Sequence, residues 1–154
     1  MPRIYTVAFN GVAVTAAQDL FELTPADDKP ITILGWALDQ TTDFGDAAAE
    51  QLGLQVIRGF TTSGSGGSTP TPVPLDPNDA AASFTAEANN TTVANTGTTT
   101  TPYSAGWNIQ AGCRDWFPEG MQPKATQANT TIVLRQTAPA DSITLNGVIW
   151  VAEG

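Results

Sequence analysis

The stretch ITILGWALD, residues 31–39, decides the fold class of this chain. Side chains alternate between the two faces of an extended strand, and here both faces are apolar, with Ile33 and Ala37 on one and Leu34 and Trp36 on the other. A strand that is apolar on both faces is typical of the middle of a sheet, where both sides are covered. Residues 31–39 therefore predict a central strand and the best part of the hydrophobic core.

Alternating apolar and polar residues also precede and follow this stretch. Residues 4–9 alternate and lead through Asn10-Gly11 into residues 12–15, which predicts a hairpin because a two-residue turn needs positive φ angles. We expect another strand around Phe21 and one over residues 52–58. Between them, residues 43–51 hold the one plausible short helix. The N-terminal part thus predicts a succession of short strands.

The C-terminal part continues this pattern. Residues 83–86 and 89–101 are rich in threonine and asparagine, which suits strands at an edge or on a polar face. Residues 107–113 alternate as one half-buried strand that ends at 116–120, and residues 132–134 form a short apolar strand. For residues 143–151 we favour one long strand over a second hairpin at Asn146-Gly147. The whole chain predicts an all-β fold, an antiparallel β-sandwich or jelly roll of about 8–10 strands with at most one short helix.

One long irregular segment, residues 59–82, interrupts the strands. Its first part, 63–68, is almost entirely glycine and serine, and Pro70, Pro72, Pro74 and Pro77 follow. Splitting the chain there leaves two pieces that are small for independent cores, so we interpret residues 1–154 as a single domain with a long loop or arm at 59–82. We expect the glycine part to be mobile until it is bound, and residues 69–78 to lie extended along a neighbouring subunit or another protein surface.

Composition excludes several partners and compartments. Fifteen acidic against six basic residues give a net charge of −9, so nucleic acid is not an expected partner. No stretch is long and apolar enough for a membrane helix, and no secretion signal opens the sequence, so we expect a protein made in a cytoplasm, with no membrane partner. Cys113 is alone, which rules out an internal disulfide and predicts a buried small hydrophobic residue.

The sequence offers little for catalysis. It has no histidine, which removes the commonest general base and most zinc sites. Asp39, Asp43 and Asp46 are weak candidates for a calcium site, and a carboxylate-based hydrolase is a remote alternative, but the latter two suit the start of a short helix. We predict a protein that is not an enzyme and has no cofactor.

The aromatic residues divide into core and surface candidates. Trp36, Trp107 and Trp150 fall at core positions of predicted strands, whereas Trp116 and Phe117 lie at a strand end where two adjacent rings cannot both point inward. We therefore predict a contact surface at this pair. The full set of predicted interface residues is Thr69, Pro70, Pro72, Pro74, Leu75, Pro77, Trp116 and Phe117.

Several segments resemble small proteins of tailed bacteriophages. They are residues 5–9 (YTVAF), 17–25 (AQDLFELTP), 43–50 (DFGDAAAE), 58–92 and 138–153, whereas residues 99–124 show no such likeness. The resemblance implies a capsid decoration, or cement, protein: a jelly roll, often trimeric, on the outside of the phage head. It implies the major capsid protein lattice and further copies of the chain as partners, and the virion as the location after synthesis in the host cytoplasm. The alternative is a receptor- or carbohydrate-binding module of a phage tail, for which Trp116 and Phe117 would be the residues to test.

Overall fold

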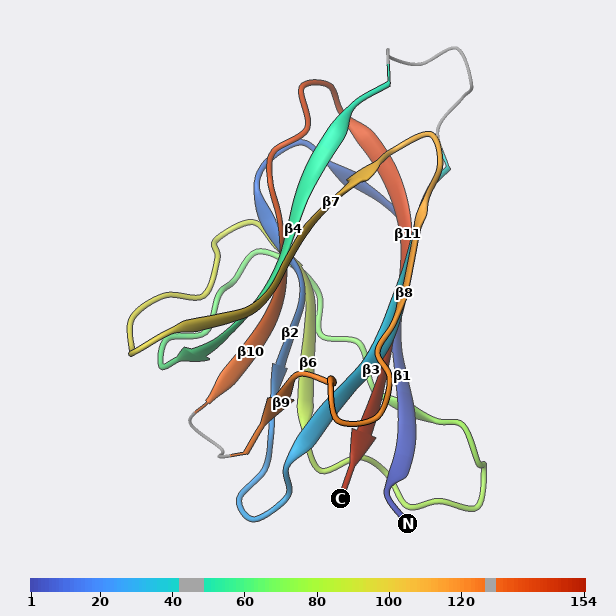
Figure 1. The fold of residues 1–154 in the computed structure, drawn as a ribbon, viewed down its shortest axis with the longest axis vertical. Helices are drawn as coiled ribbons and strands as arrows, with labels where there is room; N and C mark the ends of the chain where they lie inside the picture. Colours follow the sequence, from blue (N-terminus) through green and yellow to red (C-terminus); the bar gives the residue numbers. More distant parts are fainter. Residues whose placement is uncertain (42–48, 127–129) are drawn as a thin grey trace.

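The computed structural model describes residues 1–41, 49–126 and 130–154, and within these ranges the chain consists of strands and loops without a helix (Figure 1). The predicted helix at 43–51 lies mostly outside the described residues. The strands are β1 (Arg3–Val14), β2 (Gln18–Thr24), β3 (Ile31–Gln40), β4 (Gln51–Phe60), β5 (Val73–Pro74), β6 (Thr85–Asn90), β7 (Thr100–Asn108), β8 (Cys113–Trp116), β9 (Lys124–Ala125), β10 (Thr131–Gln136) and β11 (Ile143–Glu153).

Two antiparallel sheets pack face to face, which confirms the predicted sandwich. Sheet 1 has the order β5-β1-β11-β3-β8, with β9 also paired to β3, and sheet 2 has the order β6-β2-β10-β4-β7. Strands near the start of the chain pair with strands near its end: β1 with β11, β2 with β10, β3 with β8 and β4 with β7. Such a long antiparallel ribbon, rolled so that these successive strand pairs alternate between two sheets, is a jelly roll.

The core lies between the sheets and is built from alternate residues of each strand. Strand β11 shows the pattern most clearly, because Ile143, Leu145, Gly147, Ile149 and Val151 are buried while the residues between them are partly exposed. Trp36 from sheet 1 and Phe21 from sheet 2 are fully buried in the same apolar cluster. Removing this much apolar surface from water is the main driving force for a fold of this kind.

Strand β3 is central in sheet 1, between β11 and β8, as predicted. Its two faces differ from the prediction, because an irregularity in the pairing between Ile33 and Gly35 shifts the alternation. Ile33 and Trp36 are therefore both buried toward the core, while Leu34 and Ala37 are partly exposed on the outer face. A bulge of this kind adds one residue to a strand and reverses the facing of the residues beyond it.

The hairpin predicted at Asn10-Gly11 is wrong. Strand β1 runs through both residues and pairs with β11 on either side of them, with a bulge between Phe9 and Val12. Gly11 has a φ of +64° there, and its N–H donates a hydrogen bond of 2.7 Å to Oδ1 of Asn146. Positive φ serves a bulge as well as a turn, so the dipeptide alone could not distinguish them. The prediction of one long strand at the C-terminal end is confirmed by β11.

The single strand predicted over residues 107–113 is also wrong. Trp107 is the buried residue of β7 in sheet 2, and Cys113 begins β8 in sheet 1. Between them a turn is closed by a hydrogen bond of 3.0 Å from the N–H of Ala111 to the carbonyl of Asn108, and Gly112 has a φ of +74°. Ile109 is still buried, but Gln110 and Ala111 of the turn are exposed, so the alternation in the sequence does not reflect burial beyond Ile109.

Residues 61–99 return the chain from β4 to β7 and close one side of the sandwich. Residues 62–68 run antiparallel to 88–95 through bridges that join Thr62 to Asn95, Ser65 to Thr92 and Ser68 to Ala88. Further on, β5 adds to the outer edge of β1 and β6 to the outer edge of β2. The glycine-rich part is therefore packed against its own domain, and the prediction that it is mobile until bound is wrong.

Candidate docking face on the first sheet

The outer face of sheet 1 carries a row of residues that spans five strands. Antiparallel pairing places Val73, Thr6, Trp150, Gly35 and Trp116 side by side, in that order, from β5 across to β8. Directly paired residues point to the same face of a sheet, so this row forms one continuous strip. We call it the indole row.

The two indoles of this row stack on each other. The ring centroids of Trp116 and Trp150 are 4.7 Å apart with an interplanar angle of 38°. Gly35 lies between them, and a Cβ atom at that position would come 3.0 Å from the Trp116 ring and 2.3 Å from the carbonyl oxygen of Asp115. The glycine thus leaves the space in which the rings meet. Trp116 keeps 59% of its surface exposed, which is unusual for the largest apolar side chain.

Small apolar residues form the next row. Ala8, Val148 and Ala37 lie side by side, and all three are at least partly exposed. A shallow pocket of about 230 Å³ opens here, lined by Phe9, Ala37, Asp39, Asn146, Gly147 and Val148. We call the indole row, this row and the pocket together the docking face. It combines a raised aromatic ridge with an adjacent hollow.

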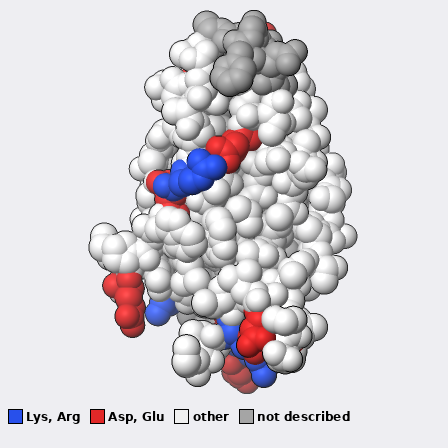
Figure 2. Space-filling model, turned by 90° about the vertical axis from the view of Figure 1, so that its right-hand side faces the viewer, with Lys and Arg blue, Asp and Glu red and all other residues white. Residues whose placement is uncertain are grey.

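Charge is scarce on this face. It includes one ion pair, between Nη2 of Arg114 and Oδ2 of Asp39, 2.9 Å apart, in which Asp39 lines the pocket and Arg114 continues the row of small residues onto β8. Figure 2 views the molecule from the side on which β1, β8 and β11 lie in Figure 1, and most of that surface is free of charged side chains. In a chain of net charge −9 this surface is distinct from an ordinary solvated one.

The structure separates the two aromatic residues predicted as a contact surface. Trp116 points outward, whereas Phe117 turns inward and packs edge to face on Trp36 and Tyr103, with centroids 5.2 Å from each. Trp150, predicted as a core residue, instead lies partly exposed on the outer face against Trp116, so that prediction is wrong. Trp36 and Trp107 are buried, as predicted.

The predicted arm lies along the edge of the same face. Val73 is 56% exposed and Leu75 is 55% exposed, and the N–H of Leu75 donates a hydrogen bond of 2.9 Å to the carbonyl of Ile4. Arg3 and Asp79 form an ion pair of 3.6 Å nearby. Thr69, Pro70, Pro72 and Pro77 belong to the loop that flanks β5, with Thr69 and Pro77 exposed and Pro70 and Pro72 half-buried. The arm is thus anchored to its own β1, and whether it also contacts a partner stays a prediction.

The calcium candidates do not come together in the described residues. Asp39 is engaged with Arg114, and Asp43 and Asp46 lie outside the residues that the structure describes. Within residues 1–41, 49–126 and 130–154, no three His, Cys, Asp or Glu side chains gather as a metal site would require. In the same ranges no helix could cross a membrane.

Cys113 is the first residue of β8 and is half-buried. Burial raises the pKa of its thiol to about 11, and the Asp115 carboxylate, whose Oδ2 is 3.4 Å from the sulfur, adds to this increase. A thiol with such a pKa stays protonated near neutral pH and is a poor nucleophile. The neighbouring Tyr103 donates a hydrogen bond of 2.9 Å to the same carboxylate. Cys113 is therefore a packing residue, although it is less buried than the sequence predicts.

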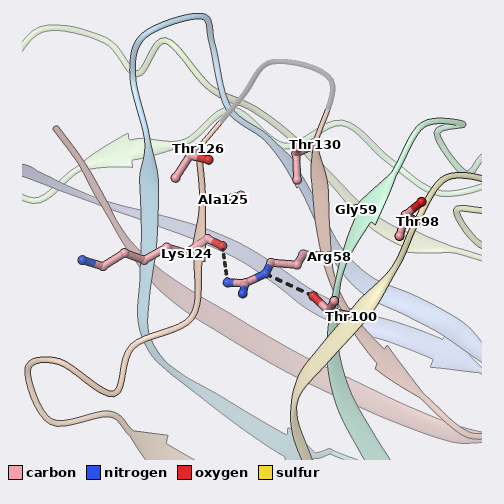
Figure 3. Close-up of a pocket in the computed structure, with 8 residues that line it drawn as sticks. All are labelled: Arg58, Gly59, Thr98, Thr100, Lys124, Ala125, Thr126 and Thr130. Carbon is pink, nitrogen blue, oxygen red and sulfur yellow. Dashed lines mark hydrogen bonds between the residues drawn. The ribbon is translucent and has the colours of Figure 1, made fainter.

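A second, polar hollow lies near Thr100, at the start of β7, and was not predicted from the sequence. It measures about 390 Å³ and is lined by Arg58, Gly59, Thr98, Thr100, Lys124, Ala125, Thr126 and Thr130 (Figure 3). The Arg58 guanidinium donates to Oγ1 of Thr100 at 3.3 Å and to the backbone carbonyl of Lys124 at 2.9 Å, while the Lys124 ammonium points away. Arg58 thus ties β4 of sheet 2 to β9 of sheet 1.

Comparisons with protein-family models, with curated proteins and with solved structures found no match to this chain.

Proposed function

We propose that this chain is a non-enzymatic structural protein that binds the outside of an assembled phage capsid and stabilises it, with the docking face as the contact surface. The observation that carries the proposal is the indole row. It places exposed Val73 of the arm and exposed Trp116 on one strip, although the two residues are far apart in the sequence. The phage assignment itself rests on the resemblance of the sequence segments described above.

The chemistry of the face suits protein binding. Tryptophan is enriched among the residues that dominate binding energy, and contact cores are depleted in charge. The stacked indoles and the row of Ala8, Val148 and Ala37 offer both features, and the Arg114–Asp39 ion pair supplies a polar group beside them. The six-stranded sheet beneath holds these side chains in place, so little conformational entropy is lost when a partner binds.

A cement protein acts by mass action. It binds the assembled lattice better than free capsid subunits and so stabilises the shell by its binding free energy. A net charge of −9 keeps free copies apart, whereas the charge-poor face can approach another protein without that repulsion. The trimeric state and the location on the head exterior are parts of this proposal.

The direct test is to measure the protein in purified virions and its affinity for assembled capsids that lack it. We expect copies in proportion to the capsid lattice and an affinity that falls by roughly 30-fold, about 2 kcal/mol, in Trp116→Ala. Gln55→Ala is the matched control, because Gln55 is exposed on sheet 2, away from the docking face. A few copies confined to the tail, or unchanged affinity in Trp116→Ala, would contradict the proposal.

A carbohydrate-binding role is the second candidate. It is favoured by one observation: the indole ridge lies beside a pocket that presents Asp39 and Asn146, and aromatic faces with a few fixed polar groups are a common way to bind small ligands. Binding to a glycan array that disappears in Trp116→Ala, together with the absence of capsid binding, would favour this role over capsid attachment.

A further inference from the structure

The two edge strands of sheet 2, β6 and β7, differ in whether other parts of the chain pair with them. On one side β6 covers β2, and residues 62–68 follow β6 through isolated bridges. On the other side β7 pairs with β4, and no strand of the described residues pairs with its far side. An open strand edge presents a line of N–H and C=O groups that another strand can join.

The direction of these backbone groups follows from the pairing with β4. Just past the end of β7, the N–H of Ile109 donates to the carbonyl of Glu50 at 3.1 Å, so this residue faces β4. Alternate residues of a strand direct their backbone groups to the same side. Tyr103 and Ala105 therefore face β4 as well, while Ser104 and Gly106 face the open side. Pro102 lies at the irregularity between the Val56 and Arg58 pairs and has no partner on β4 in this register. Proline fits there, since its missing N–H breaks no bond within the sheet.

Nothing in the sequence of this edge repels another strand. Proteins usually protect an open edge with lysine or other charges, yet residues 88–113 contain no Asp, Glu, Lys or Arg. Pro102, Ser104 and Gly106 are all exposed. The two residues that would contact a new strand most closely, Ser104 and Gly106, are among the smallest in the chain, so their side chains leave the backbone accessible.

We propose that β7 pairs antiparallel with β7 of a second copy, centred on Ser104. In this register the N–H of each Ser104 donates to the carbonyl of the other Ser104, and the N–H of each Gly106 donates to the carbonyl of the opposite Pro102. Pro102 acts only as an acceptor and ends the ladder on both sides, which limits the pairing to this register. The two copies then share one continuous sheet across a twofold axis.

A second copy fits this edge better than a charged partner strand would. Two chains of net charge −9 repel each other over most of their surface, and the charge-free edge of β7 is a place where they can approach closely. Neither copy needs to rearrange, because the strand is already formed and extended against β4. This pairing does not depend on the capsid-binding proposal and uses a different surface.

Cysteine cross-linking tests the register. Directly opposed residues of a hydrogen-bonded antiparallel pair have Cα atoms about 5.5 Å apart, within the range for a disulfide. In a Cys113→Ser background, Ser104→Cys is therefore expected to form a covalent dimer under mild oxidation. Thr101→Cys is the matched control, because two copies of Thr101 would be about 20 Å apart at ~3.3 Å per residue. Equal cross-linking of both variants, or none from Ser104→Cys, would overturn the register.

Sedimentation equilibrium of the chain with its native Cys113 provides an independent test. We expect a concentration-dependent dimer whose dissociation constant rises by about tenfold or more in Ser104→Lys, because two ammonium groups then face each other. Thr85→Lys on β6, at the opposite edge of the sheet, should leave the dimer intact. A protein that stays monomeric at all concentrations, or a dimer unaffected by Ser104→Lys, would overturn the proposal.

Discussion

The outer faces of the two sheets are built in opposite ways. Over β2, β10 and the end of β4, the outer face of sheet 2 is covered by its own chain, residues 61–68 and 91–96, and it buries charged groups beneath that cover. The outer face of sheet 1 has no such cover among the described residues and is apolar and poor in charge. Where the chain covers itself, it uses polar groups to fix the cover, and where it stays open, it presents groups suited to a partner.

Two carboxylates fix the cover of sheet 2. Asp19 is fully buried, accepts a hydrogen bond of 2.8 Å from the N–H of Ala94, and pairs with Nε of Arg135 at 2.7 Å. Glu22 accepts bonds from the N–H of Gly64 at 3.0 Å and from the side chain of Asn90 at 2.9 Å. Each carboxylate therefore joins a strand of the sandwich to the loop above it.

A small apolar cluster completes this cover. Ile57, Phe60, Ala94 and Val133 are buried together on the outer side of sheet 2, apart from the main core. The Arg135 guanidinium lies 4.9 Å above the Phe60 ring, a distance at which the cation is attracted to the ring face. The cover is thus held by both burial and charge, whereas the docking face has apolar groups that remain in contact with water.

The sharpest test of the comparison applies the same substitution to both faces. Arg135→Met leaves the carboxylate of Asp19, which is 0% exposed, buried without its cation, and we expect a loss of about 3–5 kcal/mol in the free energy of unfolding. Arg114→Met removes the partner of Asp39, which is 41% exposed, and we expect a change of about 0–1 kcal/mol. Urea unfolding of both variants measures the difference. Similar losses at the two sites would show that the faces are not built differently.

A smaller effect is expected from a methyl group placed under the cover. In Gly64→Ala the new Cβ would lie 2.3 Å from the backbone carbonyl oxygen of Thr92, so the cover must shift, at about 1–3 kcal/mol. The control is Gly106→Ala on β7, where the nearest atom is 3.4 Å away and the change should stay below about 1 kcal/mol. Thermal unfolding of the two variants compares them, and equal melting temperatures would mean that the cover is loosely packed.

The smallest expected effect is a pH dependence that arises from Asp19. Burial raises the pKa of this carboxyl above its ordinary value of 3.8, although the hydrogen bond and charge of Arg135 oppose the shift. The folded state then binds this proton more tightly than the unfolded chain does. The contribution of Asp19 to stability is therefore fully present below pH 3.8 and is lost as the pH rises through the raised pKa.

The measurement is urea unfolding of the wild type and of Asp19→Asn between about pH 3 and pH 7. We expect the advantage of the wild type over the variant to decrease as the pH rises. An advantage that grows with pH would show that the attraction of Arg135, and not burial, determines the pKa of Asp19.

Much of the fold could be predicted from the sequence, because alternation of apolar residues reports burial directly. Strands β3, β4, β10 and β11 lie where that pattern placed them. The errors at Asn10-Gly11 and over residues 107–113 have one cause. Alternation shows that a residue faces the core, but it carries no information on which sheet or which partner strand it belongs to.

The docking face was only partly predictable for a related reason. Trp116 and the arm were each expected to lie on the surface, yet only the register of β5, β1, β11, β3 and β8 shows that they share one row. The packing of residues 62–68 was missed because it depends on backbone bridges and on the carboxylate of Glu22. Glycine and serine in a sequence indicate flexibility but do not reveal what the backbone will bond to.

The pairing of the first strand with the last also determines when the chain can fold. Arg3 of β1 pairs with Glu153 of β11, and β11 separates β1 from β3. Sheet 1 therefore cannot close until β11 has left the ribosome, and until then β1 and β3 lack their common partner. Contacts this distant in sequence are typical of proteins that fold in about milliseconds to seconds. A chain whose synthesis stalls before residue 143 lacks β11, so we expect chaperones to bind it. In the folded protein, detachment of β11 would separate β1 from β3 in the middle of sheet 1.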